Sequence, residues 1–243
     1  MLVKTQAILL HHVRYSDNSL IARFYTRDYG RMSVMVKGLS SRKGGNKFAY
    51  FQALNIFNIE LYHNDNREIQ NLKELSLSFI PKKIPSDITR SSVAMFMSEI
   101  LYSVIREEDP NRMLYDFIES SVITLDEMEM GLSNFHLWFL VAFTAYAGIG
   151  PSSTDLEDCF FDMLSGKFTA IHPMHPDCME PHAAAVLNRL LQITPADLGT
   201  LRLTGEDRSE MLTMMLRYYA LHLTGIKQIH SLNVLREIFR GND

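Results

Sequence analysis

The sequence predicts an α+β protein in which a small β-barrel, residues 1–80, precedes an all-α helical domain, residues 81–243. Two observations predict this division. Residues 5–80 largely alternate with a period of two and are rich in β-branched and aromatic side chains, which is typical of strands. After Pro81 and Pro85 the period changes to 3.6, which is typical of helices. A chain of 243 residues is long enough to bury a sizeable core without metals or disulfides.

Five strands are expected in the N-terminal region, each followed by a turn-like segment rich in Gly, Asn, Asp or Ser. The expected strands are Thr5–Val13, Ser19–Arg27, Arg31–Lys37, Phe51–Tyr62 and Asn71–Phe79. Gly30 is able to take the positive φ that a three-residue hairpin loop requires. Five short strands within about 75 residues have to close on themselves or pack as a sandwich. We expect a five-stranded barrel of the OB type.

Six helices are expected in the C-terminal region. They span Ser86–Arg106, Asn111–Leu125, Asn134–Tyr146, Pro181–Gln192, Glu206–Thr224 and Ser231–Phe239. The fifth has a clear start signal, because Thr204 is followed three residues later by Asp207, as in a capping box. Residues 150–180, with three prolines, predict a long irregular link.

Positive charge is concentrated in the first fifth of the chain. Residues 1–48 hold nine Lys and Arg against two acids, Asp17 and Asp28, although the whole chain carries a net charge of −4. A basic region on an acidic protein is the signature of a polyanion-binding surface, and nucleic acid is the commonest polyanion. The alternative is that these side chains only solvate a surface.

Strand alternation places several of these cations on one face of the second hairpin. The outer face is expected to hold Arg23, Tyr25, Arg27, Arg31, Ser33, Met35 and Lys37. A three-residue loop would pair Arg27 with Arg31 and Tyr25 with Ser33. Like charges side by side cost stability, so a ligand that neutralises them is the simpler explanation. OB folds bind oligonucleotides on this surface, with cations along the phosphates and aromatic rings against the bases.

The segment Gly38–Lys47 adds three cations and several glycines without the spacing of a nucleotide-binding loop. We interpret it as a mobile basic flap over bound DNA; a solvated hairpin loop is the alternative. The predicted DNA-binding residues are therefore Arg14, Arg23, Tyr25, Arg27, Arg31, Lys37, Arg42, Lys43 and Lys47.

Several segments resemble bacterial recombination mediators of the RecO family. They are Thr5–Leu9, Tyr15–Leu20, Phe24–Thr26, Gly30-Arg31, Val36–Gly38, Ser98–Leu101 and Ser231–Glu237. The resemblance implies an OB-fold domain, a helical domain, and binding and annealing of single- and double-stranded DNA. It also implies cooperation with RecR and RecF in loading RecA onto DNA coated by single-strand-binding protein.

The acidic tail of single-strand-binding protein is a further partner implied by the resemblance. We expect it to dock on the helical domain, in an apolar pocket with a cation at its rim. The candidate rim cations are Arg90, Arg106, Arg112, Arg189, Arg202, Arg208 and Arg217.

The irregular segment departs from the family. Many RecO relatives bind zinc there with two CxxC pairs, whereas the equivalent positions read Cys159, Asp162, His175 and Cys178. These residue types are able to build a tetrahedral zinc site, but Asp is an uncommon structural ligand and Phe160-Phe161 is typical of packing. We expect a decayed site without metal, and no cofactor; zinc at these four residues is the alternative.

No catalytic constellation is present in the sequence, so we expect a protein that is not an enzyme. One alternative is a metal-dependent nuclease that uses the acids and histidines of residues 155–178. Another is a pure protein adaptor whose basic face meets an acidic partner.

Sparse cysteine use fits a reducing cytosol, and the apolar run 137–149 is shorter than the ~18 residues of a membrane span. We expect a cytoplasmic, nucleoid-associated protein that does not contact membrane.

Overall fold

The computed structural model describes residues 1–41, 45–106, 109–224, 226 and 229–240. The chain forms two compact units, Met1–Asp126 and Glu127–Asp243. The predicted boundary at residue 80 follows the last barrel strand, and the helices up to residue 126 belong to the same compact unit as the barrel.

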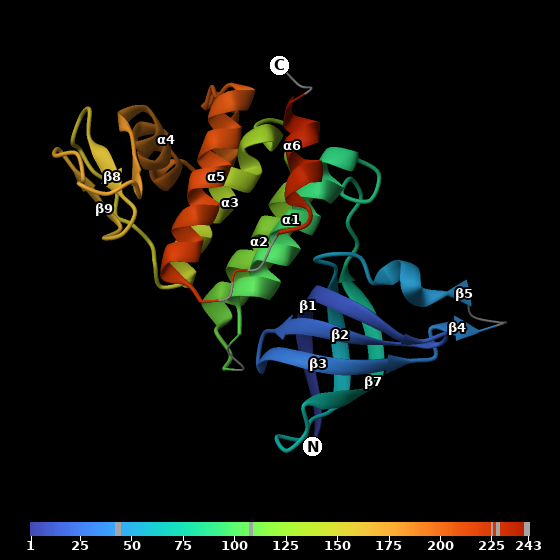
Figure 1. The fold of residues 1–243 in the computed structure, drawn as a ribbon. Helices are drawn as coiled ribbons and strands as arrows, with labels where there is room; N and C mark the ends of the chain where they lie inside the picture. The colour runs from blue at the N-terminus through green and yellow to red at the C-terminus, as the bar shows by residue number, and fades with distance from the viewer. Residues whose placement is uncertain (42–44, 107–108, 225, 227–228, 241–243) are drawn as a thin grey trace. The chain divides into compact units, whose positions relative to one another are not determined.

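Five strands of the first unit close into a barrel, as the sequence predicts (Figure 1). They are β1 (Leu2–Ser16), β2 (Ser19–Thr26), β3 (Gly30–Lys37), β6 (Ile56–Tyr62) and β7 (Ile69–Phe79). Their order is β1-β2-β3-β7-β6, and the β3–β7 pair that completes the closure is parallel. The predicted fourth strand starts later than expected, because Leu54 takes a positive φ of 62° in a turn that precedes β6.

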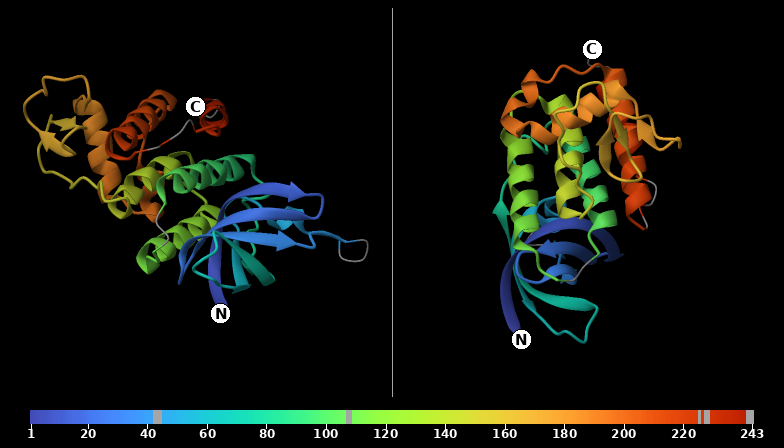
Figure 2. Two further views of the ribbon diagram at one scale, coloured as in Figure 1. Left: turned by 60° about the horizontal axis from the view of Figure 1, so that its bottom comes forward. Right: turned by 90° about the vertical axis from the view of Figure 1, so that its left-hand side faces the viewer.

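The segment expected to be a basic loop contains secondary structure of its own. A two-stranded ribbon, β4 (Ser40–Ser41) and β5 (Gly45–Asn46), is followed by the short helix η1 (Lys47–Tyr50). The ribbon extends beyond the end of the barrel at which β3 ends (Figures 1 and 2).

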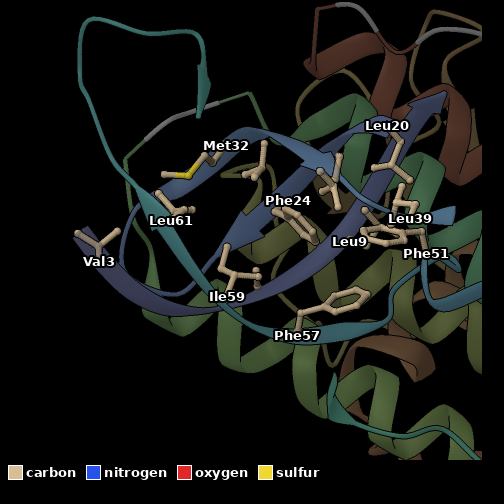
Figure 3. Packing of buried hydrophobic residues seen from close by; sticks show 14 residues of the cluster. Val3, Leu9, Leu20, Phe24, Met32, Leu39, Phe51, Phe57, Ile59 and Leu61 are labelled. Carbon is tan, nitrogen blue, oxygen red and sulfur yellow. The ribbon is translucent and has the colours of Figure 1, made fainter. Parts of the chain in front are cut away.

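Apolar side chains from every strand fill the barrel, with those of β7 partly buried. Figure 3 shows the fully enclosed part of this cluster, including Phe24, Phe57 and Phe51. Phe24 of β2 contacts Phe57 of β6 edge to face, with ring centroids 5.7 Å apart, and Phe51 stacks on the same ring. These side chains occupy the alternating inward positions that the sequence pattern predicts. The strand faces inferred from alternation are therefore confirmed for the core.

The register of the second hairpin differs from the prediction. Thr26 pairs with Gly30, so Tyr25 lies opposite Arg31 and Arg23 lies opposite Ser33. The turn closes one residue earlier than expected because the Thr26 hydroxyl donates to the Gly30 carbonyl (2.9 Å) and accepts from the Tyr29 amide (3.1 Å). The predicted juxtaposition of Arg27 and Arg31 across the hairpin is wrong.

Two helices complete the first unit, α1 (Ile88–Val104) and α2 (Arg112–Glu127). Asp87 caps α1 by accepting hydrogen bonds from the amides of Thr89 and Arg90. The Ser98 hydroxyl donates to the Leu10 carbonyl of β1 at 2.5 Å, which ties α1 to the barrel. The carboxylate of Asp126 accepts the amides of residues 82–84 and so fixes the link between β7 and α1.

The described residues of the second unit form four α-helices. They are α3 (Leu132–Tyr146), α4 (Pro181–Gln192), α5 (Gly205–His222) and α6 (Leu232–Arg240), with a short helix η2 (Pro195–Thr200) before α5. The predicted capping box of Thr204 and Asp207 is confirmed at the start of α5. All six predicted α-helices exist, with ends that shift by a few residues.

The segment 150–180 is not wholly irregular, contrary to expectation. It contains a small antiparallel sheet of β8 (Phe160–Asp162), β9 (Lys167–Thr169) and β10 (Cys178–Met179), which packs against α4 (Figure 1). Phe161 is fully buried and contacts Phe168 and Tyr218, so the sheet contributes to the core of the unit. None of the described helices has both the length and the apolar character needed to cross a membrane.

Candidate nucleic-acid interface

Tyr25 does not face solvent, although alternation places it on the outer side of the barrel. Its side chain is 1% exposed, and its hydroxyl donates to the Asn111 carbonyl, directly before α2, at 3.3 Å. The outer face of β2 and β3 is covered here by the helical part of the same unit. The predicted stacking of a base on Tyr25 is therefore wrong.

Arg31 is also engaged by the helices. Its guanidinium donates to the carbonyls of Tyr102 (3.1 Å) and Ile105, at the C-terminal end of α1, and lies 4.6 Å from the Tyr102 ring centroid. Carbonyls at a helix C-terminus have no partner within the helix, and a cation there is favourable. Burial lowers the pKa of Arg31, and the nearby positive charges of Arg23 and Arg106 lower it further. Arg31 thus helps to hold α1 against the barrel.

Arg27 serves the same purpose toward α2. It pairs with Asp116 at 3.0 Å, donates to the Gln6 side chain at 3.0 Å, and lies 5.6 Å from the ring centroid of Tyr115. A second pair, Arg112 with Asp28 at 2.8 Å, joins the start of α2 to the β2–β3 turn. The positive charge of Arg27 is compensated within the unit, so its predicted contact with DNA is not supported by this geometry.

Arg14 and Lys37 are exposed at the end of the barrel opposite the β2–β3 turn. Lys37 is exposed and lies opposite Ser19 at the end of β3. Arg14 is exposed, pairs with Asp17 at 3.3 Å, and lies 5.3 Å from the ring centroid of Phe48. Arg23, nearer the middle of β2, is partly exposed and donates to the Ser33 hydroxyl.

Exposed aromatic rings accompany these cations. Tyr15 is 68% exposed at the end of β1, and Tyr50 is 47% exposed in η1. We name Arg14, Tyr15, Lys37, Phe48 and Tyr50 the hairpin-end surface. The amide of Leu39 donates to the Asn18 carbonyl at 3.3 Å, which joins the chain after β3 to the β1–β2 turn.

Sequence reasoning found the cations of the hairpin-end surface but missed its aromatic residues. The predicted first strand stops at Val13, whereas β1 continues to Ser16 and carries Tyr15 outward. The signal was present in the alternation of Val13, Tyr15 and their polar neighbours. The predicted residues Arg42 and Lys43 lie outside the described residues, and the side chain of Lys47 is not described.

Comparison with known proteins decides the family. Residues 1–80 match the family described as "Recombination protein O N terminal", and residues 85–232 match "Recombination protein O C terminal". The chain belongs to the RecO family. It is 36% identical over 240 residues to the DNA repair protein RecO of Phocaeicola vulgatus, a match that covers 98% of this chain and 100% of the relative.

Other RecO proteins align equally completely. The identity is 36% over 245 residues with the protein of Bacteroides fragilis and 32% over 240 residues with that of Flavobacterium psychrophilum, each with 98% of this chain and 100% of the relative covered. The family expected from the sequence is confirmed, and the chain is a DNA repair protein of that family.

The four residues expected as the alternative zinc site, Cys159, Asp162, His175 and Cys178, do not form a group of possible ligands among the described residues. Cys159 is buried with its thiol 3.5 Å from the Leu156 carbonyl. Asp162 accepts from the amides of Leu164 and Ser165 and pairs with His175 at 3.2 Å. The four residues of the alternative zinc site are therefore not gathered as one set of ligands in this structure, and the expected absence of zinc stays a prediction.

Another group of possible metal ligands lies beside the small sheet. Nε2 of His172 is 3.3 Å from a Glu180 carboxylate oxygen and 4.0 Å from the Cys178 thiol, and among the described residues this is the one group of three possible metal ligands. Structural zinc takes four ligands, with cysteine as thiolate. Burial and nearby acids raise the pKa of Cys178, which disfavours the thiolate. The three donors do not fit a structural zinc site.

Most of the arginines predicted to line a tail-binding pocket are engaged elsewhere. Arg90 and Arg208 are buried and donate to backbone carbonyls, Arg112 pairs with Asp28, and Arg217 pairs with Asp177 at 2.5 Å. Arg189 differs, because it lines a cavity of about 420 Å³ whose other walls are apolar (Leu156, Pro181, Ala185) and acidic (Glu157, Asp158).

Proposed function

We propose that this RecO-family chain is a DNA-binding recombination mediator without catalytic activity of its own. It binds single- and double-stranded DNA, anneals complementary strands and helps to load the recombinase RecA onto DNA coated by single-strand-binding protein. The observation that carries the proposal is the hairpin-end surface, where the exposed cations Arg14 and Lys37 accompany the exposed rings of Tyr15 and Tyr50.

The chemistry of this surface suits a single strand of any sequence. Cations attract the phosphates and release counterions, while aromatic faces stack bases regardless of their identity. Phe48, under the Arg14 guanidinium, adds apolar area next to a charge. The three cations of residues 42–47 belong to the segment that follows β3, and they add charge to this part of the sequence.

The test is the affinity for an oligothymidine over a salt series. If four to six cations meet phosphates, log affinity falls against log salt with a slope of roughly −3 to −4. The double variant Arg14→Glu/Lys37→Glu should weaken binding to all sequences alike and flatten this slope. The matched control is Lys82→Glu/Lys167→Glu, which reverses two exposed charges elsewhere.

Three results would contradict the proposal. Equal affinity in the folded hairpin-end variant and in the control would exclude this surface. Cleavage of labelled DNA in the presence of a divalent metal would favour a nuclease. An absence of DNA binding by the full chain would favour a protein adaptor.

The protein partners proposed are RecR and the acidic, apolar-ended tail of single-strand-binding protein. The cavity beside Arg189 combines apolar lining from Leu156, Pro181 and Ala185 with a cation. Glu157 and Asp158 also line it, so Arg189 is the group there that favours an acidic tail. We expect Arg189→Ala to weaken binding of the tail peptide to the full chain, and Arg217→Ala, whose charge Asp177 already compensates, to change it less. Equal effects of the two variants would place the tail elsewhere.

The protein is proposed to act in the cytoplasm at the nucleoid.

A further inference from the structure

A second basic site lies at the opposite end of the same hairpin. A hollow of about 340 Å³ opens between the β2–β3 turn, the β6–β7 turn, Arg106 after α1 and Pro110 before α2, all within the first unit. Four arginines line it, and we name it the arginine hollow: Arg23, Arg31, Arg67 and Arg106. The rings of Tyr29 and His63, 4.9 Å apart, form one wall.

The charges of the inner arginines are not compensated by carboxylates. Among the described residues, Arg23 donates to a hydroxyl and Arg31 to carbonyls, and neither pairs with an acid. Asp28, which also lines the hollow, already accepts from Thr5 (2.9 Å) and Arg112 (2.8 Å). The positive charges of Arg23 and Arg31 are therefore available to an anion.

The other acids of the hollow lie at its mouth. Asp65 is 92% exposed and lies 3.4 Å from His63, and Glu68 is exposed. Solvent screens exposed charges more than the partly buried ones inside. Burial lowers the pKa of Arg31 most, and the neighbouring positive charges of Arg23 and Arg106 lower it further, so like charges lie together in the hollow.

Guanidinium groups that converge on a cavity are the usual means of binding phosphate, because each presents two parallel N–H donors to two oxygens. The volume of the hollow lies within the range of small-ligand sites, which leaves room for a phosphate with part of its sugar. From Arg31 to Lys37, β3 runs six residues, or about 20 Å. The arginine hollow is thus separate from the hairpin-end surface.

We propose that the arginine hollow binds a phosphate group of nucleic acid, at a second contact point on the barrel. The inference rests on the proposed function and adds to it a defined site at the other end of β2 and β3. A strand held at both points would lie along the hairpin, since an OB fold covers ~4–16 nucleotides. The phosphate comes either from the interior of a strand or from its end.

The test uses the full chain with Arg67→Ala/Arg106→Ala, because both side chains are exposed and neither is part of the barrel core. The control is Lys82→Ala/Lys167→Ala, which removes the same charge elsewhere. Affinities are measured over a salt series for oligothymidines that carry a 5′-phosphate, a 3′-phosphate or only hydroxyl ends. The hollow variant should lose about tenfold in affinity, and its salt slope should become shallower by about 1–2.

The three oligothymidines distinguish the sources of the phosphate. A loss confined to one phosphorylated end shows that the hollow binds a terminal phosphate, and an equal loss for all three shows that it binds an internal one. If the hollow variant keeps the affinity and the salt slope of the control while the wild-type chain binds DNA, the hollow is not a phosphate site. If the wild-type chain binds no DNA, the proposed function fails and the hollow fails with it. Urea midpoints of both variants confirm that they remain folded.

Discussion

Tyr25 of β2 is joined to Asn111, directly before α2, by a hydrogen bond of 3.3 Å from the phenol to the backbone carbonyl. The side chain is 1% exposed, so a residue on the outer side of the barrel acts as a core residue of the first unit. Arg27 and Arg31 contact α2 and α1 on either side of it. The cationic face of this hairpin therefore supports the helices as much as it offers charge to a ligand.

The first prediction concerns stability. Tyr25→Ala should lower the free energy of unfolding by about 3–5 kcal/mol, since it removes a large buried ring. Tyr25→Phe should cost about 1 kcal/mol, because it removes only one hydrogen bond. Urea denaturation of the full chain measures both. A Tyr25→Ala variant with unchanged stability but weaker DNA binding would show that the ring faces the ligand after all.

The second prediction concerns base stacking on the hairpin-end surface. Tyr15→Ala should cost about 1–3 kcal/mol of affinity for single-stranded DNA and leave the salt slope almost unchanged, because stacking involves no charge. Tyr15→Phe should be nearly silent. Tyr62→Ala is the matched control, since Tyr62 is 55% exposed and pairs with Leu2 at the other end of β1. A severe loss in Tyr15→Phe would mean that the hydroxyl, not the ring, makes the contact.

The barrel and its inward residues were predictable because strand alternation is a local property of the sequence. The period of two places Phe24 and Phe57 inside without any knowledge of the neighbouring strand. The same rule places Tyr25 on the outer side of the barrel, but it does not say what covers that side. Whether an outward residue meets solvent or another element depends on long-range packing, which alternation does not contain.

The hairpin register failed for a different reason. The predicted loop length of three residues is right, but the Thr26 hydroxyl bonds twice within the turn and the loop spans residues 27–29 in place of 28–30. Side-chain bonds of threonine to the backbone are common in turns, yet their choice depends on local geometry. The aromatic part of the hairpin-end surface was missed because the predicted first strand stopped at Val13, before Tyr15.

The third prediction concerns metal. Purified protein should contain less than stoichiometric zinc, and chelators should leave its melting temperature unchanged, because the one group of possible metal ligands in the described part of the chain has three members and the pKa of the Cys178 thiol is raised. Elemental analysis and thermal unfolding with and without chelator measure this. Cys178→Ala should change the free energy of unfolding by no more than about 0.5 kcal/mol. One zinc per chain that is lost in Cys178→Ala would contradict the prediction.

The fourth prediction concerns acid sensitivity of the second unit. His136 of α3 is fully buried and stacks on Phe239 of α6, with ring centroids 4.9 Å apart and planes 11° apart. Burial, with a smaller effect of the Arg208 charge, lowers the pKa of His136 from 6.5 to about 3. The unfolded chain therefore takes up a proton below pH 6.5, whereas the folded chain does not until about pH 3.

Above pH 6.5 His136 is neutral in both the folded and the unfolded chain, so its burial has no pH-dependent cost. As the pH falls below 6.5, the free energy of unfolding decreases by at most about 1.4 kcal/mol per pH unit. Between pH 7 and pH 5 the free energy of unfolding should fall by about 1–2 kcal/mol, and His136→Phe, which keeps a ring against Phe239, should reduce that fall. Urea denaturation at several pH values measures how the free energy of unfolding changes with pH. A cost of the substitution that is the same at every pH does not affect this change. Most carboxylates titrate below this window and do not obscure the result.

His182 provides a control of opposite sign. Its ring lies 2.8 Å from the Asp207 carboxylate, and this hydrogen bond raises the pKa of His182 above 6.5. The stabilisation from this pair is present below pH 6.5 and is lost as the pH rises through the folded pKa. His182→Gln should therefore make the acid-induced loss steeper, whereas His136→Phe makes it shallower. If both variants shift the slope in the same direction, burial of His136 is not the cause of the acid sensitivity.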